Sequence, residues 1–208
     1  MRVRSFLITS LVVLAGCGGG ATVSESQCYA GDWQTLGYRD GSQGLRSTQI
    51  LEHQNACVPF GVVPDRASYM AGWQEGVAEY CPPGNGFDVG EQGYLHNNVC
   101  PDSQRAEFER AYRSGRQLYL ARVEVDDLVR TIDQRHYRLG QIESELLKSA
   151  TEQMNPVLTP AERVDLLAWT KRLVEEKAAI QHELPGLEAQ LAEKSSRLAA
   201  LEVTTASR

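Results

Sequence analysis

Apolar residues recur every three or four positions through the second half of the chain, in two long runs. The first run consists of Leu118, Ala121, Val125, Leu128, Ile132, Leu139, Ile142 and Leu146. The second consists of Leu166, Leu173, Ile180, Leu184, Leu187, Leu191, Leu198 and Leu201. This spacing is typical of helices with one apolar stripe, as in coiled coils. The pattern therefore predicts one long helix over residues 102–150 and a second over residues 159–203.

The segment between the two runs carries the signals of a helix end and a helix start. Asn155-Pro156 interrupts the pattern, and Thr159 and Glu162 flank a proline in the arrangement of a capping box. A short connection between two long helices favours an antiparallel hairpin, here about 65–70 Å long. Pro185 falls inside the second run, but the apolar spacing keeps its phase there. We therefore expect a kink at Pro185 rather than a helix end.

Residues 28–101 contain shorter apolar segments, broken by glycine and proline. They predict short helices capped by Asp32 and Asp65, another over residues 46–56, and a loop with about one turn of helix over residues 84–101. An aromatic residue followed three positions later by glycine recurs at Tyr38–Gly41, Tyr69–Gly72, Phe87–Gly90 and Tyr112–Gly115. Glycine costs a helix about 1 kcal/mol relative to alanine, so we interpret these motifs as close helix contacts. A glycine-and-aromatic surface for a ligand such as a glycan strand is the alternative.

The first sixteen residues have the features of an export signal. Two early arginines precede an apolar run from Phe6 to Leu14, which is too short to span a bilayer as a mature helix. The run ends in Leu14-Ala15-Gly16-Cys17, which resembles the lipobox of bacterial lipoproteins. The resemblance implies cleavage before Cys17 and attachment of fatty acids such as palmitate to that cysteine. An ordinary secretory signal that happens to end in cysteine is the alternative.

The lipobox resemblance also implies a location. Two or more acyl chains hold a protein stably on a membrane. Gly18 stands where lipoproteins of the inner membrane carry aspartate. The expected location is therefore the periplasmic face of the outer membrane of a Gram-negative bacterium. Residues 17–27 are small and polar, and predict a flexible tether after the signal peptide of residues 1–16.

Four cysteines remain once Cys17 carries lipid, and an even number in an exported chain indicates two disulfides. They are Cys28, Cys57, Cys81 and Cys100. Four cysteines allow three pairings, and we favour Cys28–Cys57 with Cys81–Cys100 because sequential pairing closes the shorter loops. A weaker alternative is zinc, because His53 and His96 each stand four residues before a cysteine. The sequence thus predicts a mainly α-helical protein, with a disulfide-stapled helical module followed by a coiled-coil hairpin.

Charge and motifs narrow the possible functions. The formal net charge is −6, which argues against nucleic acid and against adhesion to anionic lipid through charge. Paired carboxylates cleave glycosidic bonds, and the candidates are Asp40, Asp65, Glu75, Glu79 and Asp88. Their spacing fixes no pair at the required separation. The chain has no nucleophile elbow, phosphate loop or dinucleotide fingerprint. We therefore expect a protein that is not an enzyme and carries no cofactor.

An ordered set of motifs runs between residues 28 and 120: Cys28-x-x-Gly31-Asp32-Trp33, Gly37-x-x-Asp40-Gly41-x-x-Gly44, His53-x-x-x-Cys57, Phe60-Gly61-Val62-x-Pro64-Asp65, Tyr69-x-x-Gly72, Tyr80-Cys81, Gly86-Phe87, Gly90-x-x-Gly93, Val99-Cys100-Pro101 and Phe108-x-x-Ala111-Tyr112-x-x-Gly115. This set resembles a proteobacterial lipoprotein family of unknown function, DUF2799. The resemblance implies no catalytic role. Phe60 departs from it, because a tyrosine is expected there.

Together these observations predict a membrane-anchored periplasmic lipoprotein that interacts with another envelope component or has a structural role. The alternative is a module that binds or cleaves peptidoglycan or another glycan. The expected partners are the membrane, through the lipid, and an envelope protein or peptidoglycan. Leu147, Leu167 and Val174 lie beside the main apolar stripe and leave self-association through the coiled coil open.

Overall fold

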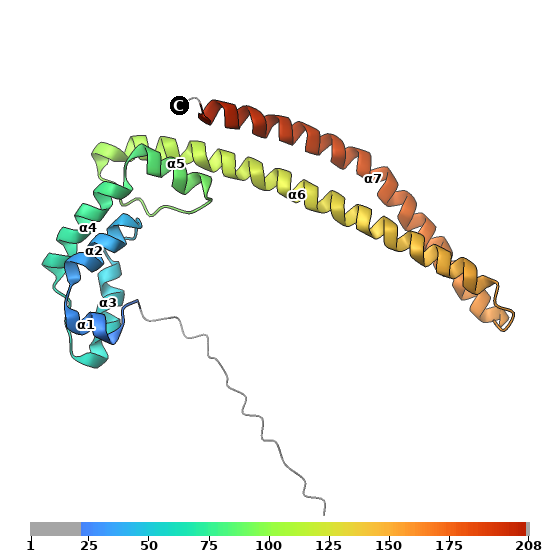
Figure 1. Cartoon of the computed structure of the whole chain (residues 1–208), viewed down its shortest axis with the longest axis horizontal. Coiled ribbons are helices and arrows are strands. Elements are labelled where there is room, and N and C mark those ends of the chain that lie inside the picture. Colours follow the sequence, from blue (N-terminus) through green and yellow to red (C-terminus); the bar gives the residue numbers. More distant parts are fainter. Residues whose placement is uncertain (1–21, 207–208) are drawn as a thin grey trace, which may run out of the picture. The chain divides into compact units, whose positions relative to one another are not determined.

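The computed structural model describes residues 22–206, and every regular element among them is a helix (Figure 1). The mainly α-helical class is therefore confirmed. In chain order the elements are α1 (Glu25–Ala30), α2 (Trp33–Ser42), α3 (Gln49–Cys57), the 3-10 turn η1 (Val58–Phe60), α4 (Arg66–Tyr80), α5 (Pro83–Glu91), α6 (Asp102–Gln153) and α7 (Pro160–Ala206). None of the described helices meets the length and hydropathy needed to cross a membrane. The lipobox and Cys17 lie outside the described residues.

The chain divides into two compact units, with the boundary between Val77 and Ala78, inside α4. This differs from the sequence analysis, which placed the change of character near residue 102. The reason is that α5 and the start of α6 pack together, so the second disulfide belongs with the long helices rather than with the first module.

The starts of α2, α4 and α7 carry the side-chain caps that the sequence predicts. Asp32 accepts a hydrogen bond from the backbone N–H of Thr35 at 3.2 Å, and Asp65 accepts two from the start of α4. The Thr159 and Glu162 capping box before α7 is formed in both directions. These local bonds satisfy N–H groups that a helix start leaves unpaired, so the three predicted caps are confirmed.

In the first unit, α2 and α4 interlock through glycines. A Cβ placed on Gly72 would overlap the carbonyl oxygen of Gln34 and lie only 2.9 Å from the nitrogen of Tyr38. A Cβ on Gly37 would overlap the carbonyl oxygen of Tyr69 in the same way. Gly41 and Gly76 repeat the arrangement one turn further along the two helices. The close helix contacts predicted from the aromatic-x-x-Gly motifs are thus confirmed.

The second unit contains a similar interlock between α5 and α6. A Cβ on Gly90 would lie 2.8 Å from the nitrogen of Arg116, and one on Gly115 would lie 2.7 Å from the nitrogen of Glu91. The prediction of a loop with one turn of helix over residues 84–101 therefore gives too little helix in its first part, where α5 extends from Pro83 to Glu91. Glycines that lower helix propensity in isolation serve here to let two helix backbones approach, and packing overrides propensity.

The helices α6 and α7 form the hairpin that the apolar runs predict. Ile142 and Leu173 are fully buried between them, with Ile132, Ile180 and Leu184 in the same cluster. The observed bounds, Asp102–Gln153 and Pro160–Ala206, extend each expected range by a few residues. Helix α7 continues through Pro185, so that proline does not end it.

The segment expected to be a flexible tether is partly ordered. Val23 is 2% exposed and packs in the core of the first unit. Ser24 and Gln27 form a capping box, and α1 begins at Glu25. The prediction of a tether is therefore wrong for residues 22–27. Composition alone does not predict this order, because one buried valine and one capping box change the polar character of the segment very little.

Candidate functional site

Three helices of the first unit bring together a buried polar cluster around Asp40. The Nε2 atom of His53, on α3, lies 2.6 Å from Oδ2 of Asp40, on α2. The hydroxyl of Tyr69, on α4, donates to the same oxygen at 2.9 Å. All three residues are 1% exposed or less. A buried carboxylate is costly unless it is paired, and here two side chains from other helices pair with it.

The charge of Asp40 follows from these contacts. Burial raises the pKa of its carboxyl, but the hydrogen bonds from His53 and Tyr69 and the nearby charges outweigh it and hold the pKa below its ordinary value. Burial, and then the hydrogen bond to Asp40, raise the pKa of Tyr69 well above its ordinary value. Asp40 is thus ionised and Tyr69 neutral at neutral pH. An ionised carboxylate only accepts hydrogen bonds, so Nε2 of His53 carries the proton between them.

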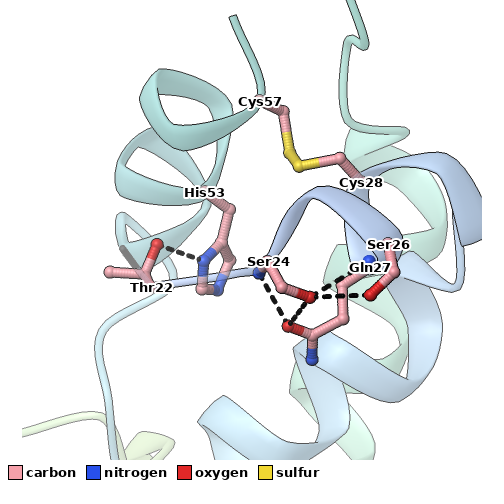
Figure 2. Close-up of a disulfide and its surroundings, with 7 residues drawn as sticks. All are labelled: Thr22, Ser24, Ser26, Gln27, Cys28, His53 and Cys57. Carbon is pink, nitrogen blue, oxygen red and sulfur yellow. Dashed lines mark hydrogen bonds between the residues drawn. A yellow bond between two sulfur atoms is a disulfide. The ribbon is translucent and has the colours of Figure 1, made fainter. Parts of the chain in front are cut away.

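The second nitrogen of His53 extends the cluster to the start of the described chain. Nδ1 lies 2.9 Å from the hydroxyl oxygen of Thr22. Figure 2 shows Thr22 beside the imidazole, with the Cys28–Cys57 disulfide at the end of the same helix. The hydrogen bond and the disulfide therefore attach the N-terminal segment to α3 at two points, about one helical turn apart.

A hydroxyl, an imidazole and a carboxylate in series are also the groups that activate a hydrolase nucleophile. In such a triad the imidazole must pass its proton on to the leaving group, which requires an open face. The imidazole of His53 is 1% exposed, and Asp40 is shared with Tyr69. The buried cluster is therefore better suited to holding the N-terminal segment against α3, through the hydrogen bond between Thr22 and His53, than to catalysis.

The four cysteines form the favoured pairs, Cys28–Cys57 and Cys81–Cys100. Their sulfurs are bonded to one another in this structure, so a zinc site built on these cysteines would require the disulfides to be reduced. His96 instead packs against the rings of Phe108 and Tyr112. Among residues 22–206, no group of three or more histidine, cysteine or acidic side chains is placed to hold a metal ion.

The candidate carboxylates do not form a common site. Asp40 is buried in the cluster, and Asp65 caps α4. Glu75 accepts a hydrogen bond from Gln34 at 3.4 Å, and Glu79 and Asp88 are exposed on α4 and α5. Sequence reasoning considered Asp40 and His53 for other roles and missed Tyr69 and Thr22 as their partners. No local pattern links residues that are 13, 29 and 31 positions apart.

Comparison with known proteins gives a family resemblance over part of the chain but no activity. Residues 32–117 match the model of a family described as a protein of unknown function (DUF2799). The resemblance to this family is thus confirmed over that stretch, which contains Asp40, His53 and Tyr69 and both glycine interlocks, but not Thr22. Most of α6 and all of α7 lie outside the match. No curated protein and no solved structure matches the chain.

Proposed function

We propose that the protein is a lipid-anchored, non-enzymatic component of the bacterial envelope, held by Cys17 on the periplasmic face of the outer membrane. In this proposal the α6–α7 hairpin contacts another envelope protein. The export-like N-terminus and the lipobox-like sequence support the anchor. The two disulfides are consistent with an oxidising compartment.

The observation that carries the proposal is the apolar surface at the turn of the hairpin. Met154 is 76% exposed and Val157 is 83% exposed. Leu147, Val164 and Leu167, on the adjoining ends of α6 and α7, are also more than half exposed. Scattered apolar residues on a surface are ordinary, but several around one turn indicate a contact site for a protein.

The base of the hairpin is held firmly within the second unit. The guanidinium of Arg122 on α6 donates to Glu91 on α5 at 2.8 Å and to Glu202 on α7 at 3.3 Å. One side chain thus joins three helices, in addition to the glycine contacts between α5 and α6. A hairpin with a fixed base can present its turn to a partner at little entropic cost.

The test is site-specific photo-crosslinking in cells from Met154, with the same crosslinker at Arg110 as a matched control. Arg110 is on α6 and its side chain is 68% exposed. We expect Met154 to capture an envelope protein that Arg110 does not capture. Capture of the chain itself would assign the turn to self-association, and capture of nothing from either position would contradict the proposal.

Two further measurements test the remaining parts. The mass of the mature protein, compared with that of a Cys17→Ser variant, reports whether Cys17 is acylated. Incubation of the purified protein with peptidoglycan sacculi tests the glycan alternative. Co-sedimentation or release of soluble fragments would replace the protein partner with a glycan, whereas neither is expected here.

A further inference from the structure

The first unit has an apolar surface beside the Cys28–Cys57 disulfide. Val58 and Val63 are 63% and 78% exposed, and they flank the turn that follows α3. Tyr29, next to Cys28, is 63% exposed, and its ring lies 6.1 Å from that of Phe60. We refer to residues 58–63 together with Tyr29 as the apolar turn.

The shape of the apolar turn is fixed by local contacts. Gly61 has a φ of +69°, which suits glycine, and the N–H of Val62 returns to the carbonyl of Cys57 at 3.4 Å. The disulfide joins Cys57 to α1. The hydrogen bond and the disulfide hold the backbone of the turn in place, so the exposure of Val58 and Val63 follows from the fold.

The apolar turn lies within a segment without ionised side chains. From Gln54 to Pro64 the sequence contains no aspartate, glutamate, lysine or arginine. Glu52 and Asp65 border the segment on either side. An aromatic ring and aliphatic side chains without neighbouring charge suit the boundary between lipid headgroups and acyl chains. The segment itself contains no basic residue that could attract anionic headgroups.

The position of the apolar turn follows from where the chain leaves the first unit. Thr22 is bonded to His53, which lies four residues, or about 6 Å of helix, before Cys57. Thr22 is five positions after Cys17, and five steps of fully extended chain span at most about 18 Å. A lipid anchor on Cys17 would thus keep this end of the first unit close to the leaflet.

We propose that the apolar turn inserts into the interfacial region of the leaflet in which Cys17 is anchored, as a second membrane contact. This inference rests on the proposed lipid anchor, and it adds a defined orientation of the first unit on the membrane. The occupant is a lipid surface of any headgroup charge, because burial of apolar side chains drives the contact.

Fluorescence quenching by brominated lipids tests the insertion. The full mature protein is purified from cells and reconstituted into phosphatidylcholine vesicles, with or without bromine on the acyl chains. A Val63→Trp variant places a reporter in the apolar turn, over the background of Trp33, Trp73 and Trp169. Gln43→Trp is the matched control, because Gln43 is exposed at the end of α2, before α3 begins.

We expect brominated vesicles to quench the tryptophan introduced at position 63 and to leave the one at position 43 unquenched. The difference should persist in 1 M salt, because no basic side chain contributes to it. Adding Val58→Asp to the Val63→Trp variant should lower the quenching, while intact disulfides and an unchanged helical circular dichroism signal show that the fold is retained. Equal quenching at positions 63 and 43 would overturn the inference.

The acylation state of the same samples separates this inference from the proposed function. Acylated protein without quenching at position 63 overturns the inference and leaves the anchor intact. Protein without acyl chains that is still quenched at position 63 removes the anchor and supports insertion by the turn alone. Protein without acyl chains that does not bind vesicles overturns both.

Discussion

Two glycine-to-alanine substitutions should change stability in opposite directions. Gly72 lies in the α2–α4 interlock, where a Cβ would overlap the carbonyl oxygen of Gln34 and lie 2.9 Å from the nitrogen of Tyr38. Ordinary van der Waals contact begins at 3.4 Å, and both obstacles are backbone atoms that cannot rotate away. Gly140 lies in the middle of α6, and a Cβ there would meet nothing within 4 Å.

The magnitudes follow from two opposing effects. Alanine favours a helix interior over glycine by about 1 kcal/mol, so Gly140→Ala should stabilise the second unit by about that amount. Gly72→Ala gains the same propensity but forces α2 and α4 apart. Overpacking costs about 1–3 kcal/mol or more, and the overlap with a carbonyl oxygen puts this site at the upper end. The expected net loss is about 2 kcal/mol.

Thermal unfolding followed by circular dichroism, with the disulfides intact, measures both effects. For a unit of this size, 1 kcal/mol corresponds to a shift of about 4–8 °C, so Gly72→Ala should lower the first transition by about 8 °C or more. Gly140→Ala provides the control for the chemical change itself. If Gly72→Ala were neutral or stabilising, the backbones of α2 and α4 would not be in contact, and the interlock would be refuted.

Three other substitutions test separate parts of the structure. Leu173→Ala should destabilise the second unit by about 2–5 kcal/mol in a denaturant titration, because the side chain is 1% exposed, and a loss below 1 kcal/mol would argue against the hairpin core. Cys57→Ser should lower the unfolding free energy of the first unit by about 3–4 kcal/mol and leave a Cys28 thiol that reacts with maleimide after unfolding. Asp40→Asn should destabilise the first unit at neutral pH, and the difference from the parent should shrink below about pH 4. The native pKa of Asp40 lies below its ordinary value of 3.8, so its ionised form contributes stability above that pH, and the contribution is lost as pH falls through the native pKa. A difference that stays constant down to pH 2 would show that the ionised carboxylate is not what stabilises the cluster.

Structural features that depend on residues within a few positions of each other could be predicted from the sequence. Features formed by residues far apart in the chain could not. The two long helices and the caps at Asp32, Asp65 and Thr159 follow from spacing and from side chains within one turn. Of the three disulfide pairings that the sequence allows, the one favoured for its shorter loops is the one observed. The Asp40 cluster could not be predicted in this way, because its members come from three helices and from Thr22. The same sequence that looked like loop forms α5, because its glycines are compensated by contact with α6.

The structure explains the four aromatic-x-x-Gly motifs, because their glycines lie in two helix–helix contacts, two glycines in each. Gly41 and Gly72 belong to the α2–α4 interlock, and Gly90 and Gly115 belong to the α5–α6 interlock. The helices α2 and α5 also end alike, with Gly44 and Gly93 at positive φ after the last turn.

The basic element of this architecture is therefore a glycine-locked helix pair, used once in each unit. In the second unit one member of the pair, α6, continues far beyond the contact to become the first helix of the hairpin. One helix, α6, therefore belongs both to the locked pair with α5 and to the hairpin with α7. The Arg122 bridge to Glu91 and Glu202 resists separation of the same three helices.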